Sequence, residues 1–412
     1  LDTIYYHRIA YPFYVFMLVV LLATILLGTG VNGASSWLRI GGFTVQPAEF
    51  GKLATTLALA RYISSYHFSF NRVKDILVVA TIIFVPMLFI VLQRDTGSAL
   101  VYAALIMVLF REGLNGWIYA AIGMVVFLFI FSFIVTPTVL LAMIVIICAL
   151  IQGSMNHNWK AVSIYLAGVA FFSALSFLGL NLALTREVSF YMCLLGTTVL
   201  SMVPVGIYAY RQKLLNILIP IVFLVGSIVV VNTVDYVFDN VLQPHQQERI
   251  LNLLGVENDL RGAGYNVNQS KIAIGSGGLF GKGFLQGTQT RYDFVPEQST
   301  DFIFSTVGEE WGFMGTLTVL ALFCFLIIRL IIMGERQHEP FGRVYCYSVA
   351  MIFLFHVVVN VGMTIGIMPV IGIPLPMFSY GSSSLLAFTV LFFIAVKLDS
   401  RKRESGELLQ SR

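Results

Sequence analysis

The stretch DFVPEQSTDFIFSTVGEEWGFMG (residues 293–315) concentrates acidic residues where an apolar segment begins. With one aspartate further upstream, the carboxylates of this region are six: Asp293, Glu297, Asp301, Glu309, Glu310 and Asp259. A carboxylate within hydrogen-bonding reach of a hydroxyl group can act as its general base. Ser299, Thr300 and Asp301 directly precede the apolar segment, so each is also a candidate helix N-cap. Asp301 is therefore a candidate for either role.

Glu309 and Glu310 lie about two helical turns inside the apolar segment. An ionised group at membrane depth is energetically expensive and needs a partner. We expect Lys271 or Lys52 to supply the positive charge. Glu309 follows Asp301 by eight residues, which places the two side chains near the same face of a helix.

A second polar cluster, NGASSWLRIGGFTVQPAEFGKL (residues 32–53), precedes another apolar segment. Pro47 suits the first turn of a helix. Glu49 and Lys52 are three residues apart, so they share a helix face and can pair. The pair is either a buried structural ion pair or part of a polar cavity. Trp37 is either a residue of the aromatic belt at the membrane interface or a platform for a ligand.

Two further polar stretches carry candidate residues. In VLQRDTGSAL (residues 91–100), Asp95 either caps the following helix or adds a carboxylate to a site. The glycine-rich stretch NVNQSKIAIGSGGLFGKGF (residues 266–284) is too apolar for an ordinary loop, and we expect a helix or hairpin at the membrane surface. Its glycines permit close backbone approach and positive φ. Basic residues of the same region, among them Arg249 and Lys271, could bind an anion.

These polar stretches interrupt a very apolar chain, of which 58% of the residues are hydrophobic and 11% charged. Runs of about 20 apolar residues can each cross a bilayer as a helix. We therefore predict an all-α polytopic membrane protein with about twelve transmembrane helices. The predicted spans are residues 11–28, 47–63, 76–92, 97–110, 117–135, 138–151, 161–180, 189–210, 215–234, 302–333, 344–367 and 382–397.

The basic residues orient these spans. Loops containing Arg61, Arg72, Arg111, Lys160 and Arg211 alternate with the loops that carry the polar clusters, and the basic C-terminal residues fall on their side. The positive-inside rule then predicts a cytoplasmic C-terminus, with a tail at 399–412, and an extracytoplasmic loop at 235–300. The four polar stretches share the extracytoplasmic face. The net charge of +4 does not favour nucleic acid as a partner.

Four motifs together resemble the SEDS (shape, elongation, division and sporulation) family, and most closely its rod-shape branch. They are WLRIGGFTVQPAEFGK, QRDTGSA, the stretch from GAGYNVNQSK to EEWGFMG, and MPVIGIPLPMFSYGSSSLL, in the family's order. The resemblance implies the SEDS fold, which is similar to that of GT-C glycosyltransferases. Residues 1–412 are accordingly expected to form a single integral-membrane domain. Relative to the family, one N-terminal helix is expected to be missing, and residues 115–210 are expected to be additional helices.

The resemblance also implies an activity: a bacterial inner-membrane glycosyltransferase that polymerises lipid II into β-1,4 glycan with inversion during cell elongation. The family's essential aspartate corresponds to Asp301, which becomes the expected general base. The expected substrate-binding residues are Trp37, Glu49, Lys52, Asp95, Arg249, Lys271 and Glu309. Expected partners are undecaprenyl-pyrophosphate-linked glycan, membrane lipid and a class B penicillin-binding protein of the elongation type. No cofactor is certain, and a divalent cation, Mg²⁺ or Mn²⁺, is the open alternative.

Two other classes of function fit the same composition. A lipid II flippase should place polar residues at broken helices near the bilayer centre, whereas here they gather at one face. A scaffold that only holds the penicillin-binding protein would not need Asp301. A third alternative is a different glycosyltransferase that uses a polyprenol-linked substrate. Only the four motifs favour a lipid II polymerase over it.

Overall fold

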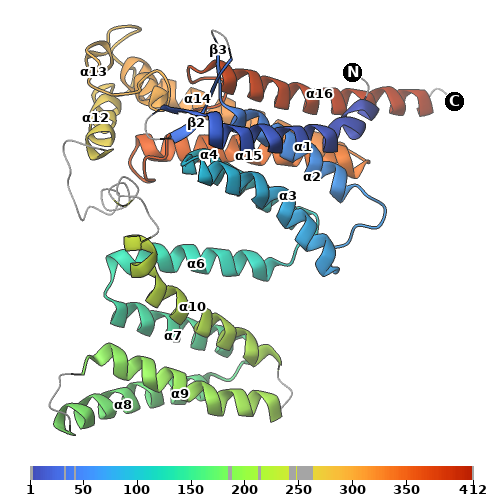
Figure 1. Ribbon diagram of the computed structural model, residues 1–412. Helices are drawn as coiled ribbons and strands as arrows, with labels where there is room; N and C mark the ends of the chain where they lie inside the picture. The colour runs from blue at the N-terminus through green and yellow to red at the C-terminus, as the bar shows by residue number, and fades with distance from the viewer. Residues whose placement is uncertain are drawn as a thin grey trace. The chain divides into compact units, whose positions relative to one another are not determined.

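The computed structural model describes residues 3–31, 34–40, 43–183, 188–211, 215–240, 247 and 263–410. The chain forms two compact units, one from residues 1–114 and 249–412 and the other from residues 115–248. Both units are helical, and the first also contains a small sheet (Figure 1).

The predicted spans all coincide with helices. Among the described residues, eight helices are long and apolar enough to cross a membrane. Shorter apolar helices account for other predicted spans, among them Thr96–Arg111, Gly116–Phe129 and Ile221–Val231. The prediction of an all-α polytopic membrane protein is thereby confirmed.

The first unit is organised around α15 (Pro340–Thr364), which packs against α2, α5, α14 and α16. The helices of this unit are α1 (Thr3–Leu27), α2 (Pro47–Ile63), α3 (Val73–Leu92), α4 (Thr96–Tyr102), α5 (Ala104–Arg111), α12 (Ala263–Ser276), α13 (Thr288–Arg291), α14 (Ile303–Arg336), α15 and α16 (Ser382–Gln410). The last helix continues well beyond the predicted end at residue 397, because Lys, Arg, Glu and Leu favour the helical conformation.

A three-stranded antiparallel sheet between α1 and α2 was not predicted. Its strands are β1 (Thr29–Val31), β2 (Ala34–Ile40) and β3 (Phe43–Val45), in that order. Ile40 pairs with Phe43, so two residues join β2 to β3. The sequence between them is Gly-Gly, which is a hairpin signal that the polar character of this segment obscured.

The helix α14 is broken near its start. It has 34 residues, and Gly312 inside it has φ 64° and ψ −159°. Residues 313–336 alone give a helix of about 36 Å, which is enough to cross a bilayer. The part before the break, residues 303–311, is therefore a separate short helix at one end of the span. It packs beside α12 and α13 (Figure 1).

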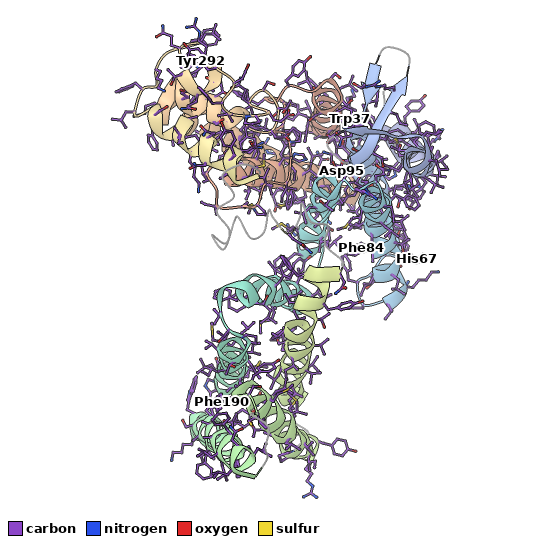
Figure 2. All side chains as sticks on the ribbon, turned by 60° about the vertical axis from the view of Figure 1, so that its left-hand side comes forward. Trp37, His67, Phe84, Asp95, Phe190 and Tyr292 are labelled. Carbon is purple, nitrogen blue, oxygen red and sulfur yellow. The ribbon has the colours of Figure 1, made fainter. Side chains whose placement is uncertain are left out.

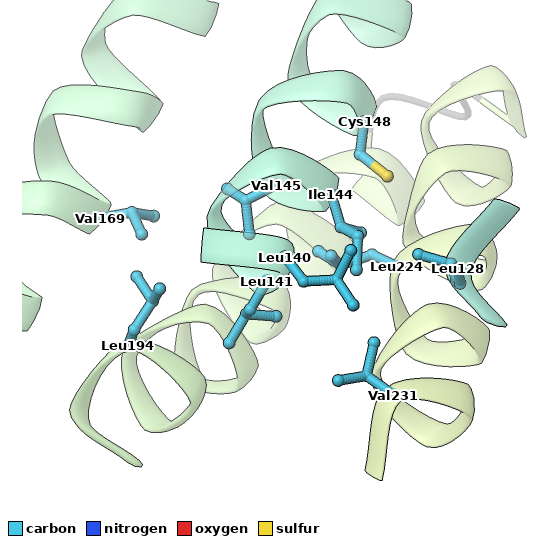
Figure 3. Close-up of a cluster of buried hydrophobic side chains, with 10 residues drawn as sticks. All are labelled: Leu128, Leu140, Leu141, Ile144, Val145, Cys148, Val169, Leu194, Leu224 and Val231. Atoms are coloured by element: carbon cyan, nitrogen blue, oxygen red, sulfur yellow. The ribbon is translucent and has the colours of Figure 1, made fainter. Parts of the chain in front are cut away.

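The second unit contains α6 (Gly116–Ile134), α7 (Pro137–Asn156), α8 (Trp159–Ala183), α9 (Phe190–Arg211) and α10 (Leu215–Asn240). Its core is aliphatic, and Figure 3 shows α7 contributing Leu140, Leu141, Ile144 and Val145 at its centre. Among the described residues of this unit, no buried side chain is charged, in keeping with the apolar sequence of this region.

Candidate functional site

Four polar segments that are far apart in the sequence meet at one end of the first unit. The links between them are Ser35 N to Gln93 O (3.0 Å), Gln46 N to Ser383 Oγ (3.3 Å) and Tyr380 N to Ser299 O (2.9 Å). Trp37 and Asp95 lie at this end, whereas His67 lies at the other end of α3 (Figure 2). The predicted convergence of the polar motifs is confirmed.

The opposite end of the unit carries basic residues, as the loop charges predicted. Arg343 Nη2 lies 2.8 Å from Glu112 Oε2, and Arg111 Nη2 lies 3.1 Å from Glu335 Oε2.

Asp95 is both a helix cap and a member of a polar cluster. Its Oδ1 accepts a hydrogen bond from Ser98 N (3.0 Å), so it is the N-cap of α4. Its Oδ2 accepts hydrogen bonds from Ser98 Oγ (2.9 Å) and from Gln46 Nε2 (2.8 Å). Gln46 directly precedes α2, so this carboxylate ties the start of α2 to the start of α4.

Asp301 lies in the turn before α14 and is partly buried. The N-cap residue of α14 is Phe302, which has no side-chain cap. The expectation that Ser299, Thr300 or Asp301 would be this N-cap is therefore wrong, because the chain turns once more before the helix begins. The Asp301 carboxylate is directed toward Gly372, since a Cβ built on that glycine would lie 3.3 Å from Asp301 Oδ2.

Glu49 and Lys52 form the predicted ion pair, with Lys52 Nζ 2.8 Å from Glu49 Oε2. Both side chains are buried. Lys52 Nζ also lies 3.1 Å from His356 Nε2 and above the ring of Phe388. His356 Nδ1 is 3.0 Å from Pro374 O, so Nδ1 donates there and Nε2 accepts from the lysine. The pair thus connects α2 to α15 and to the segment that follows α15.

Glu309 is fully buried and is satisfied by the segment 282–290 rather than by the lysines we expected. Its donors are Lys282 Nζ (2.7 Å) and Gln289 N (2.9 Å) to Oε1, and Thr290 N (2.9 Å) to Oε2. The expected pairing with Lys271 or Lys52 is therefore wrong. The predicted role of Glu309 in substrate binding stays a prediction. Because the side chain is buried, it would act on a substrate through the segment 282–290.

The glycine-rich stretch completes the broken helix α14. Lys282 N and Gly283 N donate to Glu309 O and Glu310 O (both 3.0 Å). On the other side of the break, Phe313 N and Met314 N donate to Gly278 O (2.9 Å) and Leu279 O (3.1 Å). A Cβ on Gly277 or Gly281 would lie 1.9 or 2.1 Å from a carbonyl oxygen of α14. The predicted close backbone approach is confirmed at Gly277 and Gly281, and the predicted positive φ is confirmed at Gly278, Gly281 and Gly283.

Of the three remaining candidates, two lie around the same end of the unit. Trp37 is on β2, opposite Thr29, and is partly buried. Lys271 is exposed on α12, and its Nζ would lie 2.4 Å from a Cβ built on Gly366. Arg249 lies outside the described residues.

Two buried polar residues of α15, His356 and Asn360, were missed from the sequence. They stand one turn apart on one helix face, within the apolar run FLFHVVVNVGM. Asn360 Nδ2 donates to Asp301 O (2.8 Å) and to Ile373 O (2.7 Å). Polar residues four positions apart inside a span indicate a functional helix face, and the sequence shows this spacing for His356 and Asn360.

In the part of the chain that the structure describes, no group of three or more His, Cys, Asp and Glu residues is arranged to hold a metal ion. Mg²⁺ is often held by one or two carboxylates together with substrate phosphates, so the divalent cation stays a prediction, and we derive no step through one.

The chain matches the cell cycle protein family of FtsW, RodA and SpoVE over residues 1–146 and 138–404. It belongs to this family. The two matches together extend through residues 115–210, for which the prediction of additional helices stays a prediction.

Curated relatives carry the same signal. The chain is 33% identical over 385 residues to the peptidoglycan glycosyltransferase RodA of Treponema pallidum, covering 93% of this chain and 81% of the relative. It is 29% identical over 397 residues to the peptidoglycan glycosyltransferase MrdB of Escherichia coli, covering 95% and 77%. The predictions of the family, of its rod-shape branch and of a glycosyltransferase are confirmed.

Solved structures agree on the fold. A chain from a peptidoglycan synthase complex that coordinates polymerization and crosslinking has a TM-score of 0.57 at 23% identity, with 98% of this chain and 83% of that chain covered. The rod shape determining protein RodA of Thermus thermophilus has a TM-score of 0.51 at 22% identity, with 98% and 81% covered.

Proposed function

We propose that this protein is a peptidoglycan glycosyltransferase that polymerises lipid II into β-1,4 glycan during cell elongation, with Asp301 as the general base. The observation that supports this most directly is the location of Asp301. It lies among the family motifs at one end of the unit, in the turn before α14 and against Gly372.

The chemistry needs few protein groups. The donor is a glycan held by an α-linkage to undecaprenyl pyrophosphate, and the acceptor is the 4-hydroxyl of the GlcNAc of lipid II. Asp301 removes the hydroxyl proton while the oxygen attacks the anomeric carbon, and the bond to the pyrophosphate breaks with its electron pair. One carboxylate base is sufficient because pyrophosphate leaves as an anion and does not require protonation. Attack from the opposite face gives the β-linkage.

The leaving pyrophosphate needs positive charge nearby. Among the residues that the structure describes, Lys271 is the candidate for this charge, because it is exposed on α12 and its Nζ lies near Gly366. Arg249 is a second candidate on sequence grounds. The reaction face is extracytoplasmic, which is consistent with basic residues such as Arg111 and Arg343 at the other end of the unit.

The partner is a class B penicillin-binding protein of the elongation type, which cross-links the new strand. The likeness to a chain from a peptidoglycan synthase complex supports this pairing.

The test is polymerisation of labelled lipid II by the purified protein with its penicillin-binding partner, comparing the native chain with Asp301→Asn. Glycan ladders from the native complex alone are expected. Ladders from both would keep the polymerase and reject Asp301 as its base. No ladder from the native complex would reject the polymerase and favour a flippase or a scaffold.

A further inference from the structure

We propose that Asn360 and Ser379 are positioning residues that fix the backbone which carries the Asp301 carboxylate. The proposal rests on the role of Asp301 given above.

Three consecutive carbonyl oxygens of the Asp301 turn are held by donors from distant parts of the chain. Ser299 O accepts from Tyr380 N (2.9 Å), Thr300 O from Ser379 Oγ (2.6 Å) and Asp301 O from Asn360 Nδ2 (2.8 Å). A carbonyl oxygen held in place fixes the peptide plane that it belongs to. Three such planes in a row fix the direction in which the Asp301 side chain leaves the backbone.

The same two side chains also hold the segment that faces the carboxylate. Asn360 Nδ2 donates to Ile373 O (2.7 Å), and Ser379 Oγ accepts from Leu375 N (2.7 Å). Pro374 O, between them, is bound by His356 of α15. Gly372, the neighbour of Asp301 Oδ2, directly precedes this segment. Asn360 and Ser379 therefore set both sides of the contact between Asp301 and Gly372.

Neither donor is free to move. Asn360 is 0% exposed on α15, the central helix of the unit, and Ser379 is 7% exposed. A general base must hold its geometry within a fraction of an ångström, and a displacement of about 1 Å can lower the rate about 100-fold. Asn360 meets this requirement, because it is buried on a central helix and its amide donates two hydrogen bonds.

The test uses the purified complex with the penicillin-binding partner and measures the rate of lipid II polymerisation against lipid II concentration. Ser379→Ala removes the donor to Thr300 O, and Asn360→Leu removes the donor to Asp301 O at nearly constant side-chain size. Both are expected to lower kcat about 10- to 100-fold, with KM close to native and an unfolding temperature lowered by the lost hydrogen bonds. Ser379→Thr keeps the hydroxyl and is expected to restore kcat.

Ser348→Ala is the matched control. Ser348 is a buried serine of α15 whose hydroxyl donates to Val344 O inside the same helix, so its loss tests the cost of one hydrogen bond alone. Native kcat in Ser379→Ala and in a folded Asn360→Leu, beside an inactive Asp301→Asn, would overturn the proposal. So would a loss of kcat in Ser348→Ala equal to that in Ser379→Ala. A native complex that makes no glycan would overturn the proposed function itself.

Discussion

Lys52 Nζ lies 2.8 Å from Glu49 Oε2, and the two side chains are 1% and 2% exposed. Both belong to α2, three residues apart, and His356 of α15 provides the third polar partner at 3.1 Å from Lys52. A buried pair of this kind makes each partner depend on the other, because either one alone would be an uncompensated charge.

Replacing Lys52 by Met should therefore lower the free energy of unfolding by about 3–5 kcal/mol. The double variant Lys52→Met with Glu49→Leu should recover most of that loss, because no charge is left buried. The measurement is chemical denaturation in detergent micelles. Arg111→Met is the control: its pair with Glu335 is about half exposed, so it should cost about 1 kcal/mol or less. A double variant as unstable as Lys52→Met would contradict the expectation.

Gly277→Ala and Gly275→Ala form a matched pair two residues apart. A Cβ on Gly277 would lie 1.9 Å from Gly308 O, whereas a Cβ on Gly275 meets nothing within 4 Å. Gly277→Ala should lose about 1–3 kcal/mol of stability from overpacking, and Gly275→Ala should lose none. Thermal unfolding of both variants checks this difference. Equal unfolding temperatures would mean that the contact with α14 is not tight.

Glu309→Gln should loosen the segment 282–290 without unfolding the protein. Hydrogen bonds to a charged group contribute about 1.5–3 kcal/mol, and the amides of Gln289 and Thr290 both donate to this carboxylate. Hydrogen exchange at these two amides should become faster. Glu297→Gln serves as the control, because that exposed carboxylate accepts from Thr300 in a different turn. Unchanged protection at both amides would show that Glu309 does not hold the segment.

Asp95 allows its capping role to be separated from any role in the site. Asp95→Ala should cost about 1 kcal/mol through loss of the α4 N-cap. Asp95→Asn keeps the cap and loses only the oxygen that accepts from Gln46 Nε2 and Ser98 Oγ, so it should be the more stable of the two variants. If Asp95 also contacts substrate, Asp95→Asn should lower polymerisation although the protein remains stable. Native activity in Asp95→Asn would limit the residue to its structural hydrogen bonds at the starts of α2 and α4.

The spans could be predicted because the length of an apolar run is set by bilayer thickness alone. The pairing of Glu49 with Lys52 followed from helical spacing. The break at Gly312 was not predicted, because the span 302–333 was drawn through Glu309 and Glu310 as one helix and a glycine inside a span is usually tolerated. The small sheet was missed because its strands are short and lie in a stretch read only for polarity.

At the site, the sequence indicated which motifs meet but not which side chains bind one another. Lys282 was overlooked as the partner of Glu309, although it is nearer in sequence than Lys271, because local spacing does not say which lysine meets which carboxylate. His356 and Asn360 were hidden in an apolar run, although their spacing was visible. Long-range pairs of this kind depend on tertiary structure, which local patterns do not encode.

The break in α14 bears on how the chain is assembled during translation. The carbonyls of Glu309 and Glu310 and the amides of Phe313 and Met314 bind residues 278–283. Left without partners in lipid, each such group would cost several kcal/mol. Residues 278–283 precede Gly312 in the sequence and are therefore synthesised first. The groups that hydrogen-bond the backbone around Gly312 are thus already present when the rest of α14 is made. The membrane segment can thus enter the bilayer with its interrupted turn already closed.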